Sequence, residues 1–226
     1  VVYWVLASYR AHPPVIAMDE APIRSFQRMF RKVRNRWLRN FDTLAEKMAI
    51  YFATSASDRV DGALSSMLRE HDFAVKFKTT QAQREAVQAT LAENVGLIKS
   101  IPERYLGDVE GLVMRSFQAG RDIGFLSKAL QQNYGVTKRR AALIARSQNN
   151  MATATFTRIR QSELGITKAK WLHSAGGKTP RPEHVAMSGK LYDVEKGAYL
   201  EGVWTWPGRE INCRCVSVPV IEGFIE

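Results

Sequence analysis

The spacing of apolar residues changes within one short stretch, Ser162-Glu163-Leu164-Gly165-Ile166-Thr167-Lys168-Ala169-Lys170-Trp171, and this change decides the fold class. Before Gly165 the apolar residues recur at the intervals of an amphipathic helix, and after it they alternate with polar residues as in a strand. Glycine is a preferred residue just past a helix end. The sequence therefore predicts an α+β fold, in which a mostly helical N-terminal two-thirds is followed by a small, loop-rich antiparallel β module.

Outward from Gly165, the chain divides into three predicted parts: an extended arm over 1–20, a helical domain over 21–165 and a β-rich C-terminal module over 166–226. Helix breaks are predicted after Ser55, at the capping box Ser100 to Glu103, and at Gly135. The predicted helices are 21–55, 58–72, 80–100, 100–119, 122–133 and 137–163. The predicted strands are 167–173, 191–192, 203–206 and 211–220.

The composition describes a basic globular chain. Of its 226 residues, 45% are hydrophobic and 24% are charged, which is typical of a folded domain. The 33 lysines and arginines exceed the 22 acidic residues and give a net charge of +11, which favours nucleic acid or an acidic protein surface as a partner. No apolar run reaches the roughly 18 residues that a membrane span needs. Two cysteines exclude a disulfide-dense secreted scaffold.

The first and last predicted helices carry the candidate basic contacts. Phe26, Phe30, Trp37 and Phe41 share one face of the first helix, and arginines are interleaved with them. Either this face is core and the arginines are solvated, or the helix binds DNA or an acidic partner. The candidate contact residues are Arg24, Arg28, Arg31, Arg34, Arg39, Arg139, Arg146 and Arg160.

The β module contains candidate metal ligands. If 211–216 is a strand, Cys213 and Cys215 project from the same face. Two thiolates and the imidazole of His184 are ligands that zinc prefers, and a fourth would be His173, Asp193 or water. Zinc is the one cofactor that the pattern suggests. The alternatives are two small buried residues without a metal, or a redox-active pair.

Enzymatic chemistry has weaker support. The chain contains no Gly-x-Ser-x-Gly elbow, Walker loop or His-Glu-x-x-His motif. Nothing local brings His184 within reach of either cysteine. Glu183 and His184 could act as a general-base pair, and Arg181 and Arg209 could bind phosphate, which leaves a nuclease-like enzyme or effector as the alternative. We expect the protein not to be an enzyme.

Several segments, in this order and spacing, resemble the phage head morphogenesis proteins of the Mu F-like minor capsid family. The resemblance covers about 92–219 and is strongest near the end. The first 80 residues share only a general pattern with the family, a proline-containing arm followed by a basic amphipathic helix. The segments are 94–102, 134–141, 144–149, Trp171 to Ser174, Pro180 to His184, Gly189 to Asp193, Trp206 to Gly208 and Ile211 to Cys215. The residues that carry the motif are Trp171, Arg181, His184, Gly189, Pro207, Gly208, Asn212, Cys213, Arg214 and Cys215.

The resemblance implies a minor structural protein of a tailed-phage head that acts in head assembly and in DNA packaging or ejection. Its implied location is inside the head near the portal, and the host cytoplasm during assembly. The implied partners are the portal protein and packaged double-stranded DNA, with scaffold and major capsid protein as further candidates.

The resemblance also bears on the metal and on attached domains. Some members of the family carry Cys-x-x-Cys near the position of Arg181 to His184, where this chain offers only His184. Without a metal, we expect Arg181, His184, Asn212 and the two cysteines to lock the loops of the β module together. Similar head domains are sometimes fused to toxin domains. Because this sequence stops at Glu226, we expect no such domain here.

Overall fold

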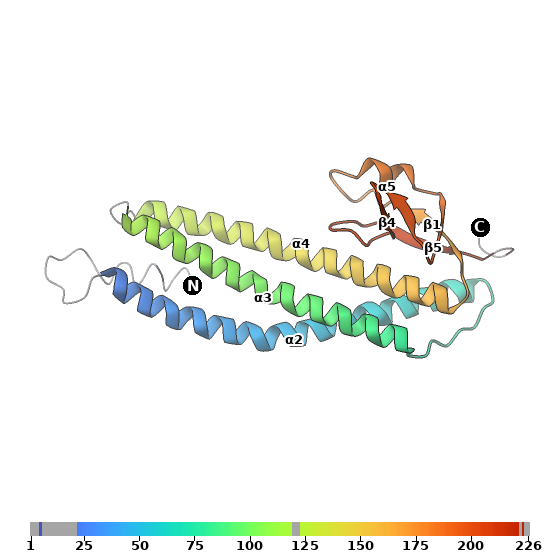
Figure 1. The fold of residues 1–226 in the computed structure, drawn as a ribbon, viewed down its shortest axis with the longest axis horizontal. Coiled ribbons are helices and arrows are strands. Elements are labelled where there is room, and N and C mark those ends of the chain that lie inside the picture. The colour runs from blue at the N-terminus through green and yellow to red at the C-terminus, as the bar shows by residue number, and fades with distance from the viewer. Residues whose placement is uncertain (1–4, 6–21, 119–122, 222, 224–226) are drawn as a thin grey trace. The chain divides into compact units, whose positions relative to one another are not determined.

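The computed structural model describes residues 5, 22–118, 123–221 and 223 of the chain. Three long helices, α2 (Pro22–Glu70), α3 (Gln81–Gln118) and α4 (Ile123–Glu163), come first. They are followed by β1 (Lys168–Leu172), α5 (Pro182–Ala186), β2 (Leu191–Asp193), β3 (Ala198–Leu200), β4 (Val203–Thr205) and β5 (Val216–Val220) (Figure 1). This order confirms the predicted α+β class. The predicted arm over 1–20 lies outside the described residues except for Val5.

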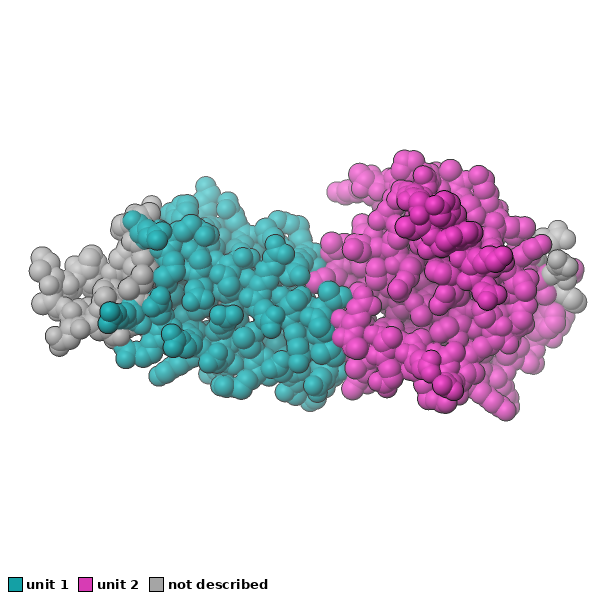
Figure 2. Space-filling view, in the orientation of Figure 1, with its two compact units in different colours: residues 1–47, 95–142 teal, residues 48–94, 143–226 magenta. Residues whose placement is uncertain are grey.

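The chain forms two compact units, shown in different colours in Figure 2. Unit 1 comprises 1–47 and 95–142, and unit 2 comprises 48–94 and 143–226. Each of the three long helices therefore contributes to both units. The division runs through the predicted helical domain 21–165, and the helical segments 48–94 and 143–163 group with the β module.

The predicted break after Ser55 is wrong, because α2 continues to Glu70. Ala49, Ala53, Ala56 and Val60 are all buried at spacings of four, three and four residues, so one apolar face runs through the polar stretch around Ser55. Tertiary packing of such a face outweighs the weak helix propensity of threonine and serine.

The predicted boundary at Ser100 is also wrong, because α3 passes through Pro102. Ser100 does not cap a new helix; its hydroxyl donates to the Leu97 carbonyl oxygen at 2.7 Å. Proline at 102 removes one backbone donor from the helix. Nearby, Arg140 of α4 bonds the Ser100 carbonyl oxygen at 3.4 Å and the Ser100 hydroxyl at 3.3 Å, which ties this part of α3 to α4.

Gly135 does not end a helix either, since it lies inside α4. A glycine in a helix interior costs only about 1 kcal/mol. Packing on both sides of it is extensive, with Leu126 and Leu130 buried before it and Ala152 and Phe156 buried after it. That packing outweighs the glycine penalty.

The core of unit 1 explains part of the aromatic face. Phe26 and Phe30 stack with their ring centroids 5.5 Å apart and are almost fully buried, with α3 and α4 supplying the remaining core residues Leu106, Val109, Val113, Leu126 and Leu130. Trp37 is 41% exposed and lies beside Phe41. The face is therefore core at its beginning and partly exposed further along α2.

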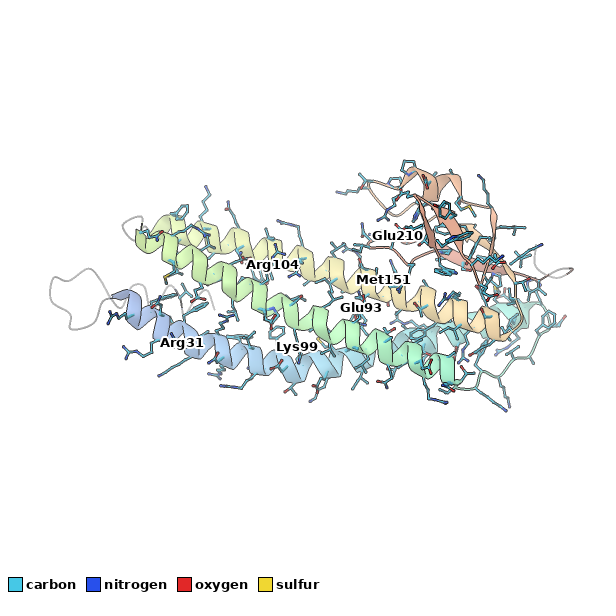
Figure 3. All side chains as sticks on the ribbon, in the orientation of Figure 1. Arg31, Glu93, Lys99, Arg104, Met151 and Glu210 are labelled. Atoms are coloured by element: carbon cyan, nitrogen blue, oxygen red, sulfur yellow. The ribbon has the colours of Figure 1, made fainter. Side chains whose placement is uncertain are left out.

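The helices of unit 2 pack through small residues and polar contacts. Ala56 and Val60 of α2 meet Ala152 and Phe156 of α4 in one buried cluster. Between α3 and α4, the Gln148 side-chain amide donates to Glu93 at 3.3 Å and contacts the Met151 sulfur at 3.7 Å. Figure 3 labels Glu93 on α3 and Met151 on α4.

The β module consists of a three-stranded antiparallel sheet in the order β2-β1-β5 and a two-stranded antiparallel sheet of β3 and β4. Trp171 and Ala169 of β1 are fully buried, because side chains that point to one face of the strand meet the module core. The predicted strand 211–220 is corrected: β5 begins at Val216, and residues before it form a turn and a loop. The sequence patterns did not indicate α5 or β3.

No helix within the described ranges has both the length and the apolar content that crossing a membrane requires.

Candidate functional site

His184 is held inside the β module by the short helix α5. Pro182 begins this helix with its fixed φ angle, and the turn that follows directs His184 inward, where only 2% of the residue is exposed. Its ring meets the Trp171 ring edge-on, with centroids 5.1 Å apart and an interplanar angle of 82°. Burial by an aromatic wall fixes the orientation of the imidazole.

The two cysteines reach His184 from a loop and not from a strand, so the strand expected over 211–216 is wrong. Asn212 turns the backbone with a φ of 60°, and both cysteines are buried and unbridged. The Cys213 sulfur lies 3.5 Å from His184 Nδ1, and the Cys215 sulfur lies 3.7 Å from the same atom. The three candidate ligands therefore lie close together in the structure, although the cysteines do not project from a strand.

The spacing of these atoms fits a tetrahedral zinc ion. Zinc bonds of about 2.3 Å to sulfur and about 2.0–2.1 Å to nitrogen place neighbouring sulfur and nitrogen ligands about 3.6 Å apart. The ligand atoms of His184, Cys213 and Cys215 all lie within 4.8 Å of one another. His173 lies at the edge of this group, with its Nδ1 3.5 Å from the Cys215 sulfur. Asp193 instead accepts the backbone N–H groups of Glu195 and Lys196.

Glu210 completes the surroundings of His184, and sequence reasoning missed it. The His184 Nε2 atom is buried without a hydrogen bond, and the Glu210 Oε1 atom lies 3.5 Å from it. Histidines that bind metals usually direct the other ring nitrogen at a carboxylate or carbonyl oxygen. Figure 3 labels Glu210 in the loop that leads to the cysteines. No local pattern pairs it with His184, which lies in a separate segment.

Arg181 connects the same carboxylate to the cysteine loop. Its Nε lies 3.2 Å from Glu210 Oε2, and a terminal nitrogen donates to the Ile211 carbonyl oxygen at 3.2 Å. Arg181 therefore has an acidic partner in this structure. It does not present a free cation for phosphate, as the enzymatic alternative had suggested.

The two thiols shift each other's pKa in opposite directions. Hydrogen bonding with Cys215 lowers the pKa of Cys213 and outweighs burial, which acts in the opposite direction. The same contact, together with burial, raises the pKa of Cys215. A lowered pKa favours the thiolate form of Cys213, which is the form that binds a metal ion.

The geometry corrects two parts of the enzymatic interpretation. His184 does contact a cysteine, which the sequence did not indicate, but both sulfurs are buried, at 4% and 5% exposure of their residues. Glu183 is not the partner of His184, because its carboxylate accepts the backbone N–H of Glu201 at 2.5 Å. A buried thiolate enclosed by ligand-type side chains is better suited to holding a cation than to attacking a substrate.

Helix α4 and the turn at Pro207 and Gly208 fix the loop that bears the cysteines. The Asn212 N–H donates to the Ser147 hydroxyl at 3.0 Å, and the Asn150 amide donates to the Cys213 carbonyl oxygen at 2.6 Å. Gly208 adopts a φ of 84°, and a side chain there would lie 3.2 Å from the Cys215 carbonyl oxygen. Pro207 beside it is buried.

Gly189 joins α5 to the first sheet. It adopts a φ of 80°, and its N–H donates to the Trp171 carbonyl oxygen at 2.7 Å. The turn therefore keeps His184 next to the central strand.

The candidate arginines have different environments. Arg24, Arg28, Arg31, Arg39 and Arg139 are exposed, and Arg34 pairs with Glu110 at 3.7 Å. Arg146 is exposed on α4. Arg160 is only 2% exposed and pairs with Asp61 and Glu163, each at 2.7 Å, so its assignment as a DNA or portal contact is wrong. The sequence pattern that grouped Arg160 with Arg139 and Arg146 could not reveal acidic partners from elsewhere in the chain.

Comparison with known proteins gives a family match over part of the chain. The model of the family described as phage Mu protein F like protein matches residues 107–218. A protein of Haemophilus influenzae (strain ATCC 51907 / DSM 11121 / KW20 / Rd), described as uncharacterized, is 28% identical to this chain over 214 residues. That match covers 91% of this chain and 46% of the relative, so the chain spans about half the length of that relative. No solved structure gives a significant match.

Proposed function

Because residues 107–218 match the model of the family described as phage Mu protein F like protein, we propose that this chain is a minor structural protein of a tailed-phage head. The family match is the observation that carries the proposal. It spans the end of α3, all of α4 and the β module with its enclosed His184, Cys213 and Cys215 site. The protein acts in head morphogenesis, inside the head and next to the portal, after assembly in the host cytoplasm.

The charge distribution supports contact with packaged DNA and with the portal. The net charge is +11, and exposed arginines follow the beginning of α2 at Arg24, Arg28, Arg31 and Arg39. Phosphate neutralisation supplies most of the affinity in sequence-independent DNA binding. Trp37, partly exposed among these arginines, is a residue type enriched in protein interfaces and supports the portal contact. Scaffold and major capsid protein are secondary partners in this proposal.

Quantitative mass spectrometry of purified particles, normalised to the portal protein, tests the proposal. We expect a few copies per particle, in a ratio that stays constant between preparations. Particles from which the DNA has been released serve as a control that separates proteins bound to the head from proteins that leave with the DNA. Abundance in the lysate without any copies in particles would contradict a structural role.

A structural role without turnover is the function that the site supports best. Cys213, Cys215 and His184 are enclosed, and Glu183 is engaged by the backbone of Glu201. Incubation of the protein with plasmid DNA, with and without added zinc, should leave the DNA intact. Cleavage that disappears in a His184→Gln variant would instead support the nuclease-like alternative.

We propose further that His184, Cys213 and Cys215 hold a zinc ion, with His173 as the fourth ligand. The ion would tie α5, the cysteine loop and the end of β1 together, as closed structural zinc sites do. Elemental analysis should give about one zinc per chain, and Cys213→Ser should lose it. Glu183→Gln, next to the site but without a ligand atom in it, is the matched control and should keep the metal.

Glu210→Gln sharpens this test, because it alters only the carboxylate that faces His184 Nε2. Loss of such a carboxylate partner typically weakens metal binding about 10–100-fold. Competition with a coloured chelator measures that change. A purified, folded protein that takes up no zinc from a metal-containing buffer would exclude the metal site.

A further inference from the structure

We infer that Arg59, Arg146 and Arg214 form a binding site for the phosphate groups of a DNA backbone. The three arginines come from α2, α4 and the cysteine loop, and all belong to unit 2. The inference rests on the DNA contact in the proposed function and deepens it, since it assigns that contact to a defined site. Of the three residues, only Arg146 was a candidate DNA or portal contact from the sequence, and Arg214 was named there as a motif residue.

The three side chains line one hollow with a volume of about 490 Å³. Asn149 and Asn150 add two side-chain amides, and Phe52 provides part of one wall. The lining therefore contains three cations and two amides, and it includes no carboxylate. A concave surface with one sign of charge focuses its potential on the ligand that enters it.

The arginines are positioned but not neutralised. The Arg59 Nε donates to the Ser55 carbonyl oxygen at 3.0 Å, which leaves its terminal nitrogens available for a ligand. A terminal nitrogen of Arg214 donates to the Gly176 carbonyl oxygen. Within the described part of the chain, none of the three takes part in an ion pair.

The cysteine loop places Arg214 at this hollow. The buried neighbours Cys213 and Cys215 face the interior of the β module, and Arg214 between them is exposed. Asn150 contributes to both sides, because it lines the hollow and donates to the Cys213 carbonyl oxygen at 2.6 Å. The position of the third cation therefore depends on the same loop that carries the candidate metal ligands.

Phosphate is the ligand that fits this set of donors. A guanidinium group presents parallel N–H donors that match two oxygens of one phosphate, and amide N–H groups supply further donors. An acidic protein segment is the competing ligand, and it would also use the neighbouring apolar groove of about 390 Å³, which Met67 and Leu64 line. The polar lining of the arginine hollow itself favours the phosphate backbone.

The test measures binding of a fluorescent random-sequence DNA duplex over a range of salt concentrations. The test variant is Arg59→Gln, Arg146→Gln, Arg214→Gln. The control is Arg69→Gln, Lys76→Gln, Lys168→Gln, which removes the same charge from exposed positions of unit 2 outside the hollow. We expect the test variant to bind at least about tenfold more weakly, and its salt slope to fall by about 2–3, since each lost phosphate contact removes about 0.9.

A smaller variant guards against misfolding. Arg59→Gln, Arg146→Gln leaves Arg214 and its contact with Gly176 intact, and it should lower the slope by about 2. Equal losses in the test and control variants would overturn the site. The site would also be overturned if the test variant kept its DNA binding but lost binding of a glutamate-rich peptide, which would indicate an acidic protein partner. In that case adding Met67→Gln should weaken peptide binding further.

The outcomes separate this inference from the proposed function. If the wild-type protein is present in particles but does not bind DNA, the proposed head protein is supported and the phosphate site is contradicted. If the protein is absent from particles but binds DNA through the three arginines, the phosphate site is supported and the proposed head protein is contradicted.

Discussion

Arg160 and a set of three other arginines in unit 2 differ in the side chains that face them. Arg160 is buried, and its guanidinium bonds both oxygens of Asp61 at 2.7 Å and one oxygen of Glu163 at 2.7 Å. Arg59, Arg146 and Arg214 are exposed around a hollow whose lining contains no acid. The charge of Arg160 is balanced by acids within the protein, whereas the other three arginines retain their charge for a ligand.

The buried Arg160 has a structural role. Arg160 also donates to the Lys78 carbonyl oxygen at 2.9 Å and lies 4.7 Å from the centre of the Phe77 ring. Burial acts to lower the pKa of Arg160, but hydrogen bonds with Asp61 and Glu163 outweigh it and raise the pKa. One side chain therefore fastens the connection between α2 and α3 onto both α2 and α4.

The largest expected effect comes from removing that side chain. Arg160→Met leaves Asp61 and Glu163, whose side chains are 26% and 24% exposed, without their cation, and losing hydrogen bonds between charged groups costs about 1.5–3 kcal/mol. Urea unfolding followed by circular dichroism measures the loss. The double variant Arg160→Met, Asp61→Leu should recover part of the lost stability, because the unpaired Asp61 carboxylate is also removed. A loss below about 1 kcal/mol would mean that the pair is not a structural support.

A moderate effect is expected for Phe77→Leu. The substitution keeps an apolar side chain but removes the aromatic face beneath the guanidinium, a contact worth about 0.5–2 kcal/mol. Lys78→Ala is the control, because the backbone carbonyl that Arg160 uses is retained. Equal unfolding midpoints for the two variants would show that the ring contributes only by filling space.

The smallest effect on stability is expected at the hollow. Arg146→Gln removes an exposed cation that makes no ion pair with any residue the structure describes, so the free energy of unfolding should stay within about 0.5 kcal/mol of the wild-type value. Its DNA salt slope should nevertheless fall by about 0.9. Arg160→Lys gives the opposite pattern, with lower stability and an unchanged slope. If both variants changed the same property, the distinction between the two groups would fail.

Periodicity was sufficient for the fold class and for the position of the helix-to-strand change at Gly165. It failed at Ser55, Ser100 and Gly135, where local signals for a helix end were present but continuous packing maintained the helices. The pattern of cysteines and histidines named three residues, His184, Cys213 and Cys215, that lie together in the structure, and their role as metal ligands stays a prediction. The sequence pattern could not supply Glu210 or distinguish Arg160 from Arg146, because both depend on partners that are distant in sequence.

The order of the three-stranded sheet also constrains when the β module can form during synthesis. Strand β1 lies in the middle, and its second neighbour is β5, with Lys168 opposite Val220. The emerging chain can pair β1 with β2 early, but the other edge of β1 stays open until residue 220 has left the ribosome. Trp171 then lacks part of its final cover. Completion of this module therefore waits for β5, and a nascent chain arrested before β5 should bind chaperones through the open edge.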